Sequence, residues 1–258
     1  FKCDTSEAKH VRRLVAFAPL PLQGMWHAAG ALADAVLHKQ NAAGLALVYA
    51  PKAHGAWNLH GATITADMQA CACFSSVVAM LGGAGQANYG AANTCLDALS
   101  TCRRSRGVAA ASVQWGAWAE IGMAARGAAS ERMDAMAAAS GFGRIALAQG
   151  LAALGTATRH ISPAVLNLTP IVWRRFLGSS AVPAFLVDFK PTAKKRKGAA
   201  ARRNEDATAS GVSLESVLEM VKRTAGGAVD ADAPVMESGV DSLGAVELRN
   251  QLQHASGA

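Results

Sequence analysis

The stretch CACFSSVVAMLGGAGQANYGAANTCLDALSTCRRSRGVAAASVQWG, which runs from Cys71 to Gly116, decides the fold. It opens with CACFSS, a short apolar run that ends at Ser76, and it closes with AASVQWG, a second run that ends at Gly116. Between them, residues 86–106 carry apolar side chains at helical spacing. Two strands joined through a helix predict a unit in which the strands are parallel.

Similar apolar runs on either side extend this pattern. GMWHAAG ends at Gly30, AVLNL ends at Leu168, and the segment from Phe142 to Leu154 again shows helical spacing. Strands that are apolar almost throughout are typical of parallel sheets covered by helices on both faces. The sequence therefore predicts an α/β fold with a doubly wound parallel sheet.

The composition excludes several classes of protein. With 51% apolar and 17% charged residues among 258, the chain is too hydrophobic for general disorder. No uninterrupted apolar stretch reaches the roughly 18 residues of a membrane-spanning helix. The first residue is Phe1 and not methionine, and the residues up to Asp4 lack the features of a signal peptide. We therefore expect an internal piece of a longer protein. We expect that protein to be cytoplasmic, with a plastid as the alternative compartment.

The cysteines predict neither a disulfide framework nor a metal site. They are odd in number, no pair is spaced as CxxC, and none has a histidine at metal-ligand spacing. Cys71 and Cys73 lie two apart in a predicted strand, so both thiols share one face and pack there. We expect a reducing compartment and no metal.

The positive charge is densest in one short segment, although the net charge of the whole chain is +7. Residues 190–210 hold seven lysines and arginines against two acids, whereas residues 211–258 are acidic. Nucleic-acid binding needs basic side chains spread over a folded face with aromatic rings, so we expect none. The composition instead predicts a basic flexible linker at 190–211, between a domain at 1–189 and another at 212–258.

The second domain is predicted to be helical and incomplete. Apolar residues from Ser213 to Thr224 recur at helical spacing, and another helix begins at Ser242. Two helices in 47 residues bury too little surface for independent stability. We therefore expect this all-α bundle to be truncated at Ala258.

One set of polar side chains suits proton transfer. Ser76 closes a predicted strand, and Tyr89 and Asn93 lie one turn apart on the same face of the predicted helix. A tyrosine acts as an acid near neutral pH only when a cation lowers its pKa of about 10, and Lys52 is the candidate. The alternative is that Tyr89 covers the core and Ser76 caps the strand end.

Four segments carry a family resemblance. They are HAAGALADAVL (His27–Leu37), PKAHGAWNLH (Pro51–His60), FSSVVAMLGGAGQANYGAANTCLDAL (Phe74–Leu99) and SVQWGAWAEIGMA (Ser112–Ala124). In this order they resemble the ketoreductase domain of type I polyketide synthases, which belongs to the short-chain dehydrogenase/reductase superfamily. That family differs from most of the superfamily in placing asparagine four residues after the tyrosine and taking the lysine from the earlier helix, as Asn93 and Lys52 do here. The resemblance covers the C-terminal two-thirds of such a domain and implies a Rossmann-like fold.

The resemblance implies NADPH-dependent reduction of a carrier-tethered β-ketoacyl thioester to a β-hydroxyacyl thioester. Tyr89 would donate a proton to the keto oxygen, and Ser76 would hydrogen-bond the same oxygen. Lys52 would sustain the acidity of Tyr89, while Asn93 would hold a proton-relay water or the backbone geometry. The residues implied to contact NADPH are Asp4, Ala29, Gly30, Lys52 and Tyr89.

A second resemblance covers the C-terminal segment. SGVDSLGAVELRNQL, from Ser238 to Leu252, resembles the attachment site of an acyl carrier protein, whose DSL serine bears 4′-phosphopantetheine. It implies that Ser242 carries this group, at a helix start where backbone N–H groups favour a phosphodiester. The alternative is that Asp241 and Ser242 only cap a helix. The implied partners are a phosphopantetheinyl transferase and the ketosynthase and acyltransferase of the parent synthase.

The sequence departs from the family pattern in two respects. No GxGxxG occurs, so we expect the first strand–helix units, with the pyrophosphate loop, to lie outside this chain, and the isolated fragment to be inactive. Leu32-Ala33-Asp34 stands where one stereochemical class has LDD, and Leu81 stands where the opposite class has tryptophan. We expect the LDD-type outcome, with Asp34, Leu81 and Met123 as the substrate and stereocontrol positions.

Two rival functions stay open at this stage. The segment could be a non-catalytic scaffold and carrier in a multidomain synthase, or the equivalent region of a type I fatty acid synthase, which has the same pair of domains. His27 and His60 have no acidic partner at a useful spacing, so we expect them to pack or to hydrogen-bond and not to catalyse.

Overall fold

The computed structural model describes residues 2–18, 21–120, 141–159, 161–178, 182–190 and 213–225, together with individual positions between 240 and 255. The chain divides into two compact units, Phe1–Val172 and Trp173–Ala258. The linker expected at 190–211 falls almost wholly outside the described residues, so the predicted division into 1–189, 190–211 and 212–258 stays a prediction.

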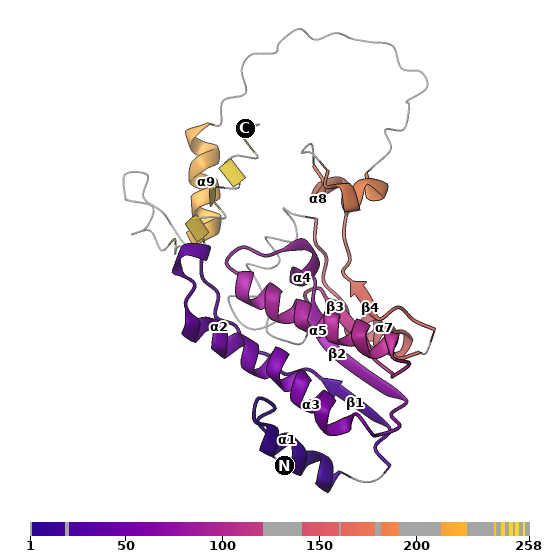
Figure 1. Cartoon of the computed structure of the whole chain (residues 1–258). Coiled ribbons are helices and arrows are strands. Elements are labelled where there is room, and N and C mark those ends of the chain that lie inside the picture. The colour runs from indigo at the N-terminus through magenta and orange to yellow at the C-terminus, as the bar shows by residue number, and fades with distance from the viewer. Residues whose placement is uncertain are drawn as a thin grey trace, which may run out of the picture. The chain divides into compact units, whose positions relative to one another are not determined.

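The first unit is built on a four-stranded parallel sheet in the order β1-β2-β3-β4 (Figure 1). Each strand coincides with a predicted apolar run, which confirms the α/β fold and the parallel sheet. Because all strands run the same way, their carboxyl ends share one edge, where doubly wound folds place their sites. The strands are β1 (Gly24–His27), β2 (Ala70–Ser76), β3 (Ala111–Trp115) and β4 (Val165–Leu168).

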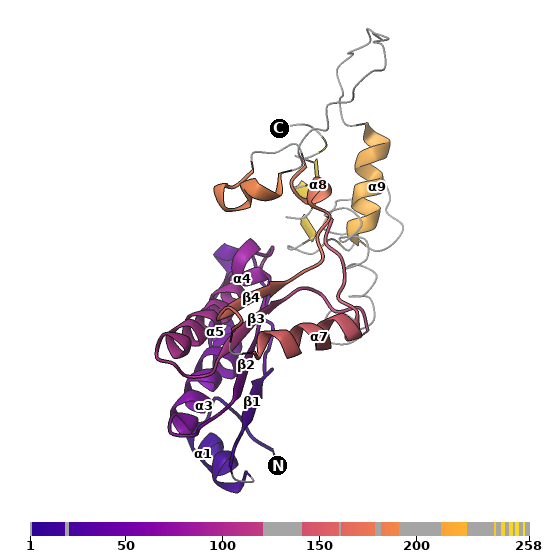
Figure 2. The same ribbon diagram turned by 90° about the vertical axis from the view of Figure 1, so that its right-hand side faces the viewer.

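Helices cover both faces of this sheet (Figure 2). On one face α5 (Ala87–Ser105) packs against β2 and β3, and on the other α7 (Leu147–Ala157) packs against β3 and β4. The shorter elements α1 (Ala8–Phe17), η1 (Leu37–Lys39) and α4 (Val78–Leu81) complete the region before α5. The long predicted helix over 86–106 is therefore confirmed within a residue at each end.

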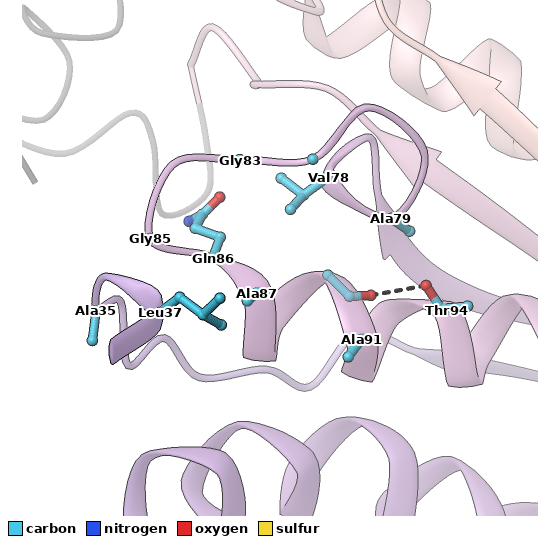
Figure 3. Close-up of a pocket in the computed structure, with 12 residues that line it drawn as sticks. Ala35, Leu37, Val78, Ala79, Gly83, Gly85, Gln86, Ala87, Ala91 and Thr94 are labelled. Carbon is cyan, nitrogen blue, oxygen red and sulfur yellow. Dashed lines mark hydrogen bonds between the residues drawn. The ribbon is translucent and has the colours of Figure 1, made fainter. Parts of the chain in front are cut away.

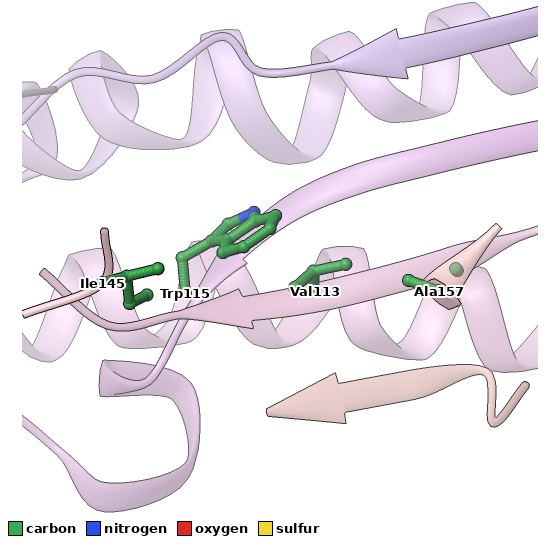
Figure 4. Close-up of a cluster of buried hydrophobic side chains, with 5 residues drawn as sticks. Val113, Trp115, Ile145 and Ala157 are labelled. Atoms are coloured by element: carbon green, nitrogen blue, oxygen red, sulfur yellow. The ribbon is translucent and has the colours of Figure 1, made fainter. Parts of the chain in front are cut away.

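Strand β3 separates two chemically different layers. Its alternating side chains Ser112 and Gln114 face α5, where both hydrogen-bond Asp97. The other face of β3 contributes to an apolar cluster on the α7 side (Figure 4). The buried members of that cluster are Ala111, Val113, Trp115, Ile145 and Ala157.

A helical segment between β1 and β2 changes its type midway. α2 (Ala42–Tyr49) is followed by η2 (Ala50–His54), a π-helical turn, and by α3 (Gly55–Thr63). Pro51 has no N–H to donate, and the Gly55 N–H reaches back five residues to the Ala50 carbonyl. Single π turns inside α-helices frequently mark functional sites.

The helix predicted from Phe142 to Leu154 begins later than expected. Phe142 and Ile145 form isolated bridges to Ile171 and Trp118, so the chain is extended there. The helix starts only at Leu147, whose N–H donates to the Glu120 carboxylate at 3.1 Å. The apolar spacing before residue 147 therefore reflects burial of an extended segment and not helical periodicity.

The second unit contains short helical elements. α8 (Trp173–Phe176) and η4 (Ala184–Phe189) are linked by the Trp173 and Phe189 rings, which stack with centroids 4.1 Å apart. α9 (Leu214–Ala225) confirms the helix predicted from Ser213 to Thr224. Its Val221 is buried with Val240 and Leu248, which form one small apolar cluster. Ser242 lies outside the described residues.

Membrane-spanning helices, metal-ligand clusters and the cysteines were also surveyed in the part of the chain that the structure describes. No helix there is long and apolar enough to cross a membrane. Within the same residues, no group of three histidine, cysteine or acidic side chains is arranged to hold a metal. All five cysteines are free thiols, and Cys71 and Cys73 are both buried, as their spacing in a strand predicted.

Candidate active site

Lys52 lies on the π-helical turn and points into the protein. Its side chain is only 3% exposed, and Nζ donates a hydrogen bond to the Phe74 carbonyl at 3.0 Å. The same ammonium lies 5.2 Å from the centroid of the Tyr89 ring. Burial lowers the pKa of Lys52 to about 8, against the opposing influence of Cys73 and Asp97. The amine is therefore mainly protonated at neutral pH.

The loop after β1 makes room for this lysine. A Cβ on Gly30 would stand 3.0 Å from Cε of Lys52 and 3.5 Å from Nζ. Glycine at this position lets the ammonium pass close to the backbone. Gly30, which is also an expected cofactor residue, therefore limits where the Lys52 side chain can lie.

Tyr89 stands in the first turns of α5, next to the end of β2, and is 8% exposed. The pKa of its phenol is raised and not lowered as expected, because burial outweighs the hydrogen bonds to Asn93 and Ser76, which act in the opposite direction. Ser76 is the last residue of β2 and is buried, and its Oγ also accepts a hydrogen bond from the Val78 N–H at 3.3 Å. The phenol and the hydroxyl therefore share one environment.

Asn93 is fully buried one turn along the same helix. Its Nδ2 donates to the Tyr89 carbonyl at 2.8 Å. Its Oδ1 is also buried, and no donor in the described part of the chain bonds to it. Since a buried acceptor without a partner is costly, this oxygen is suited to holding a water molecule.

The structure thus brings Lys52, Ser76 and Asn93 together around the buried phenol of Tyr89. The four residues come from three elements, η2, β2 and α5. Three of the expected cofactor residues, Asp4, Ala29 and Gly30, border an open groove of about 780 Å³ at the end of β1, whereas Lys52 and Tyr89 are not among its lining residues. Asp4 accepts hydrogen bonds from the Ser6 N–H and hydroxyl, which lower the pKa of its carboxyl and keep it ionised. The groove is lined by Lys2, Cys3, Asp4, Thr5, His10, Ala29, Gly30 and Pro51.

The predicted stereocontrol positions have different outcomes. Asp34 accepts a hydrogen bond from Gln86 at 3.1 Å, and burial raises the pKa of its carboxyl. Leu81 ends α4 and is half-buried, whereas Met123 lies outside the described residues. Gln86 also lines a hollow of about 440 Å³ between α5, η1 and the loop after α4 (Figure 3).

Two polar residues of α5 were missed by the sequence reasoning. Asn88 donates to the Ala33 carbonyl at 2.8 Å and accepts from the Tyr89 N–H at 2.7 Å, so it joins the stereocontrol loop to the helix start. Asp97, also buried, accepts from Ser112 at 2.5 Å and from Gln114 at 2.8 Å. Asp97 could have been found from the sequence, because an aspartate on the apolar face of a predicted helix indicates a buried polar partner.

A parallel sheet of this order, with tyrosine, serine and lysine meeting beside its carboxyl edge, defines a Rossmann-like domain of the short-chain reductase class. Residues 1–120 match the family described as the KR domain. This match and the similarity to polyketide synthases reported below agree with the ketoreductase resemblance that the sequence predicted.

Curated relatives are much longer proteins. The chain is 35% identical to spectinabilin polyketide synthase system protein NorB of Streptomyces orinoci, in an alignment that covers 99% of this chain and 12% of that protein. It is also 35% identical to a mycocerosic acid synthase-like polyketide synthase of Mycolicibacterium smegmatis, which it covers to 12% with 98% of its own length.

Solved ketoreductases share the fold. An A-type ketoreductase of a modular polyketide synthase superposes with a TM-score of 0.63 at 32% identity, over 68% of this chain and 37% of that chain. A C2-type ketoreductase gives 0.64 at 32% identity, over 74% and 41%. The first-module ketoreductase of phoslactomycin biosynthesis from Streptomyces sp. HK803 gives 0.65 at 30%, over 74% and 44%. Because both A-type and C2-type structures are similar, the stereochemical class stays a prediction.

Proposed function

We propose that this chain supplies the catalytic part of a reductase that converts a β-ketoacyl thioester into a β-hydroxyacyl thioester within a multidomain polyketide synthase. The observation that carries the proposal is the convergence of Lys52, Ser76, Tyr89 and Asn93 on one buried phenol. These side chains come from η2, the end of β2 and α5, so their proximity results from the fold and not from sequence adjacency.

Tyr89 is the proton donor in this proposal. Its hydroxyl and that of Ser76 both donate toward the keto oxygen, where negative charge develops as the carbonyl is reduced. Donors that are fixed by burial need no reorientation during the reaction. This preorganisation is what lets them stabilise the developing charge on the keto oxygen. The product oxygen leaves as an alcohol after taking the phenolic proton.

Lys52 favours the departure of the proton from the Tyr89 hydroxyl, and Asn93 helps to restore it. The ammonium of Lys52, 5.2 Å from the Tyr89 ring centroid, stabilises the phenolate. The unpartnered Oδ1 of Asn93 is placed to hold the water through which the phenol is reprotonated from solvent. Each role uses a group whose burial strengthens its electrostatic effect.

NADPH is the proposed source of hydride. The residues present fit part of this cofactor: small Ala29 and Gly30 line the groove, and the ionised carboxylate of Asp4 is an acceptor suited to an adenine amino group. The sequence has no GxGxxG to bind a pyrophosphate. We therefore propose that residues outside this chain complete the cofactor site, and that residues 1–258 alone bind NADPH weakly and are inactive.

The decisive experiment replaces Tyr89 in the synthase polypeptide that contains this chain. Tyr89→Phe removes the proton donor but keeps the buried ring, so reduction of a β-ketoacyl N-acetylcysteamine thioester should fall by about 10²- to 10⁴-fold. The synthase should then release a β-keto product. An unchanged β-hydroxy product would instead support a non-catalytic scaffold role and refute the reductase assignment.

Ser242 is proposed to carry 4′-phosphopantetheine. The support is its DSL context and the small apolar cluster that joins α9 to Val240 and Leu248. Incubation of the chain with a phosphopantetheinyl transferase and coenzyme A should add one phosphopantetheine, as measured by intact mass. Ser238→Ala should retain the addition and Ser242→Ala should abolish it; addition to Ser242→Ala would contradict the assignment.

A further inference from the structure

His27 is the last residue of β1 and the proposed mechanism does not use it. Its side chain is 3% exposed, and its Nε2 lies 3.2 Å from the backbone carbonyl oxygen of Lys52. The Pro51 carbonyl, one residue earlier, acts on the same ring. Burial lowers the pKa of His27, and the ammonium of Lys52 adds to that effect, so the ring is neutral near pH 7.

The direction of this hydrogen bond follows from its acceptor. A carbonyl oxygen has lone pairs only, so Nε2 must carry the hydrogen and donate it. A neutral imidazole has one N–H, which is then already engaged with the backbone. His27 is therefore unable to act as the proton donor to a substrate through this nitrogen.

The acceptor lies in η2, the irregular turn of the helical segment. η2 lacks one donor because of Pro51, and its closing Gly55 N–H is shared between the carbonyls of Ala50 and Lys52. π turns are rare and occur mostly as single turns inside α-helices. The contact from His27 connects this turn to the end of β1, whose partner in the sheet register is Cys73 of β2.

Packing leaves the imidazole little freedom. A Cβ on Gly55 would stand 3.2 Å from Cε1 of His27, so the first residue of α3 must be small for the ring to fit. The ring is thus held against the backbone of η2 and α3. The ring contacts the main chain of Lys52, and Nζ of the same residue donates to the Phe74 carbonyl at 3.0 Å.

We propose that His27 is a positioning residue for the reductase: its Nε2–H holds the Lys52 carbonyl and thereby keeps the Lys52 ammonium beside Tyr89. This inference rests on the proposed function of Lys52. His27 touches neither the substrate nor the reacting atoms, so it acts on the rate only through Lys52.

The test compares two substitutions that differ by one methylene, made in the synthase polypeptide. His27→Gln keeps an N–H at nearly the same reach as Nε2, whereas the amide of His27→Asn is too short to reach the carbonyl. With a β-ketoacyl N-acetylcysteamine thioester, His27→Asn should lower kcat about ten- to hundredfold with KM within about twofold. His27→Gln should restore kcat to within about threefold of the unsubstituted enzyme.

His60 offers a matched control on the same helical segment. It is a second histidine with a hydrogen bond inside the fold, 2.8 Å from Nη1 of Arg103, but it has no contact with Lys52 in the described interactions. His60→Asn should leave kcat within about twofold even where it lowers stability. Equal kcat losses in His27→Asn and His60→Asn would overturn the inference, because a general loss of stability would then explain both.

The remaining outcomes also decide the question. A loss of kcat in folded His27→Gln as large as that in His27→Asn overturns the inference, since the donor is retained. Should His27→Asn fail to fold, a folded His27→Gln with near-normal kcat supports it and a tenfold loss refutes it. Full activity of Tyr89→Phe would refute the reductase assignment itself, whereas an inactive Tyr89→Phe with an active His27→Asn would refute only the role of His27.

Discussion

The ammonium of Lys52 lies 5.2 Å from the centroid of the Tyr89 ring. Since burial lowers the pKa of Lys52 to about 8, the cation that favours the phenolate is lost as the pH rises through that value. We therefore predict that kcat/KM of the synthase-borne reductase falls above about pH 8. Stopped-assay rates between pH 6 and 10 would show this limb.

Lys52→Arg provides the control for that limb. A guanidinium stays protonated throughout this range, so the alkaline limb at pH 8 should disappear even though the larger group lowers the overall rate. Persistence of the same limb in Lys52→Arg would assign it to a different group.

Gly30 limits the position of Lys52. In Gly30→Ala the new methyl would stand 3.0 Å from Cε of Lys52, so the end of that side chain must shift by a few tenths of an ångström, beside the hydrogen bond from Nζ to the Phe74 carbonyl. We predict a loss of kcat of about tenfold or more, measured with the same thioester.

Gly61→Ala is the matched substitution, because nothing lies within 4 Å of a Cβ there and α3 is helical at that residue. It should leave the rate unchanged and raise the free energy of unfolding by about 0.5–1 kcal/mol. Similar rate losses in the two variants would contradict the steric explanation.

Asp97 joins the catalytic helix to the sheet. Its carboxylate accepts from Ser112 at 2.5 Å and from Gln114 at 2.8 Å, both on β3. Asp97→Ala leaves two buried donors without a partner, so we predict a loss of about 3 kcal/mol in the free energy of unfolding of the chain by urea. Asp67→Ala, at an exposed position, should change it by less than about 0.5 kcal/mol. A comparable small change in Asp97→Ala would show that the network is not stabilising.

The strands were predictable because their apolar runs are local and nearly continuous. Cys71–Ser76 and Ala110–Gly116 each match an observed strand within a residue. The segment from Phe142 was not predictable, because apolar spacing alone does not distinguish a helix from an extended chain that distant partners bury. Here those partners are Ile171 and Trp118, which the spacing could not reveal.

The candidate site divides in the same way. Tyr89 and Asn93 share a face of one helix, which their spacing gives directly. Lys52 was a candidate from its chemistry, but no periodicity placed it near Tyr89, because its approach to Tyr89 depends on how η2 packs against α5. Asn88 was missed because its main partner, Ala33, lies on a different loop. Long-range hydrogen bonds of this kind leave no periodic signal in a sequence.

Trp118 crosses α7 at a glycine. A Cβ on Gly150 would overlap the Trp118 ring, which also lies against Trp115 with centroids 4.9 Å apart. Gly150→Ala must therefore displace the indole, and we predict a loss of about 1–3 kcal/mol in stability by chemical unfolding. Gly155→Ala, on the same helix with open space around it, should instead be neutral or slightly stabilising. If Gly150→Ala matches Gly155→Ala, the ring does not occupy that position.

His60 should make the chain sensitive to acid. Its Nδ1 accepts a hydrogen bond from Arg103, which is 3% exposed, at 2.8 Å. Burial lowers the pKa of His60, and the charges of Arg103 and Arg106 lower it further. The folded state therefore binds this proton more weakly than the unfolded chain, whose histidine pKa is about 6.5. Stability is then complete above that pH and decreases as the pH falls below it.

His60→Gln isolates this contribution. Glutamine offers Arg103 an acceptor that does not titrate, so the decrease in the free energy of unfolding between pH 7.5 and pH 5 should be smaller in His60→Gln than in the unsubstituted chain. The two chains should differ least near pH 7.5, where His60 is neutral, and most at pH 5, where its protonation would place a second cation against a buried guanidinium. Equal pH dependence in both chains, measured by urea unfolding, would show that another group controls the acid response.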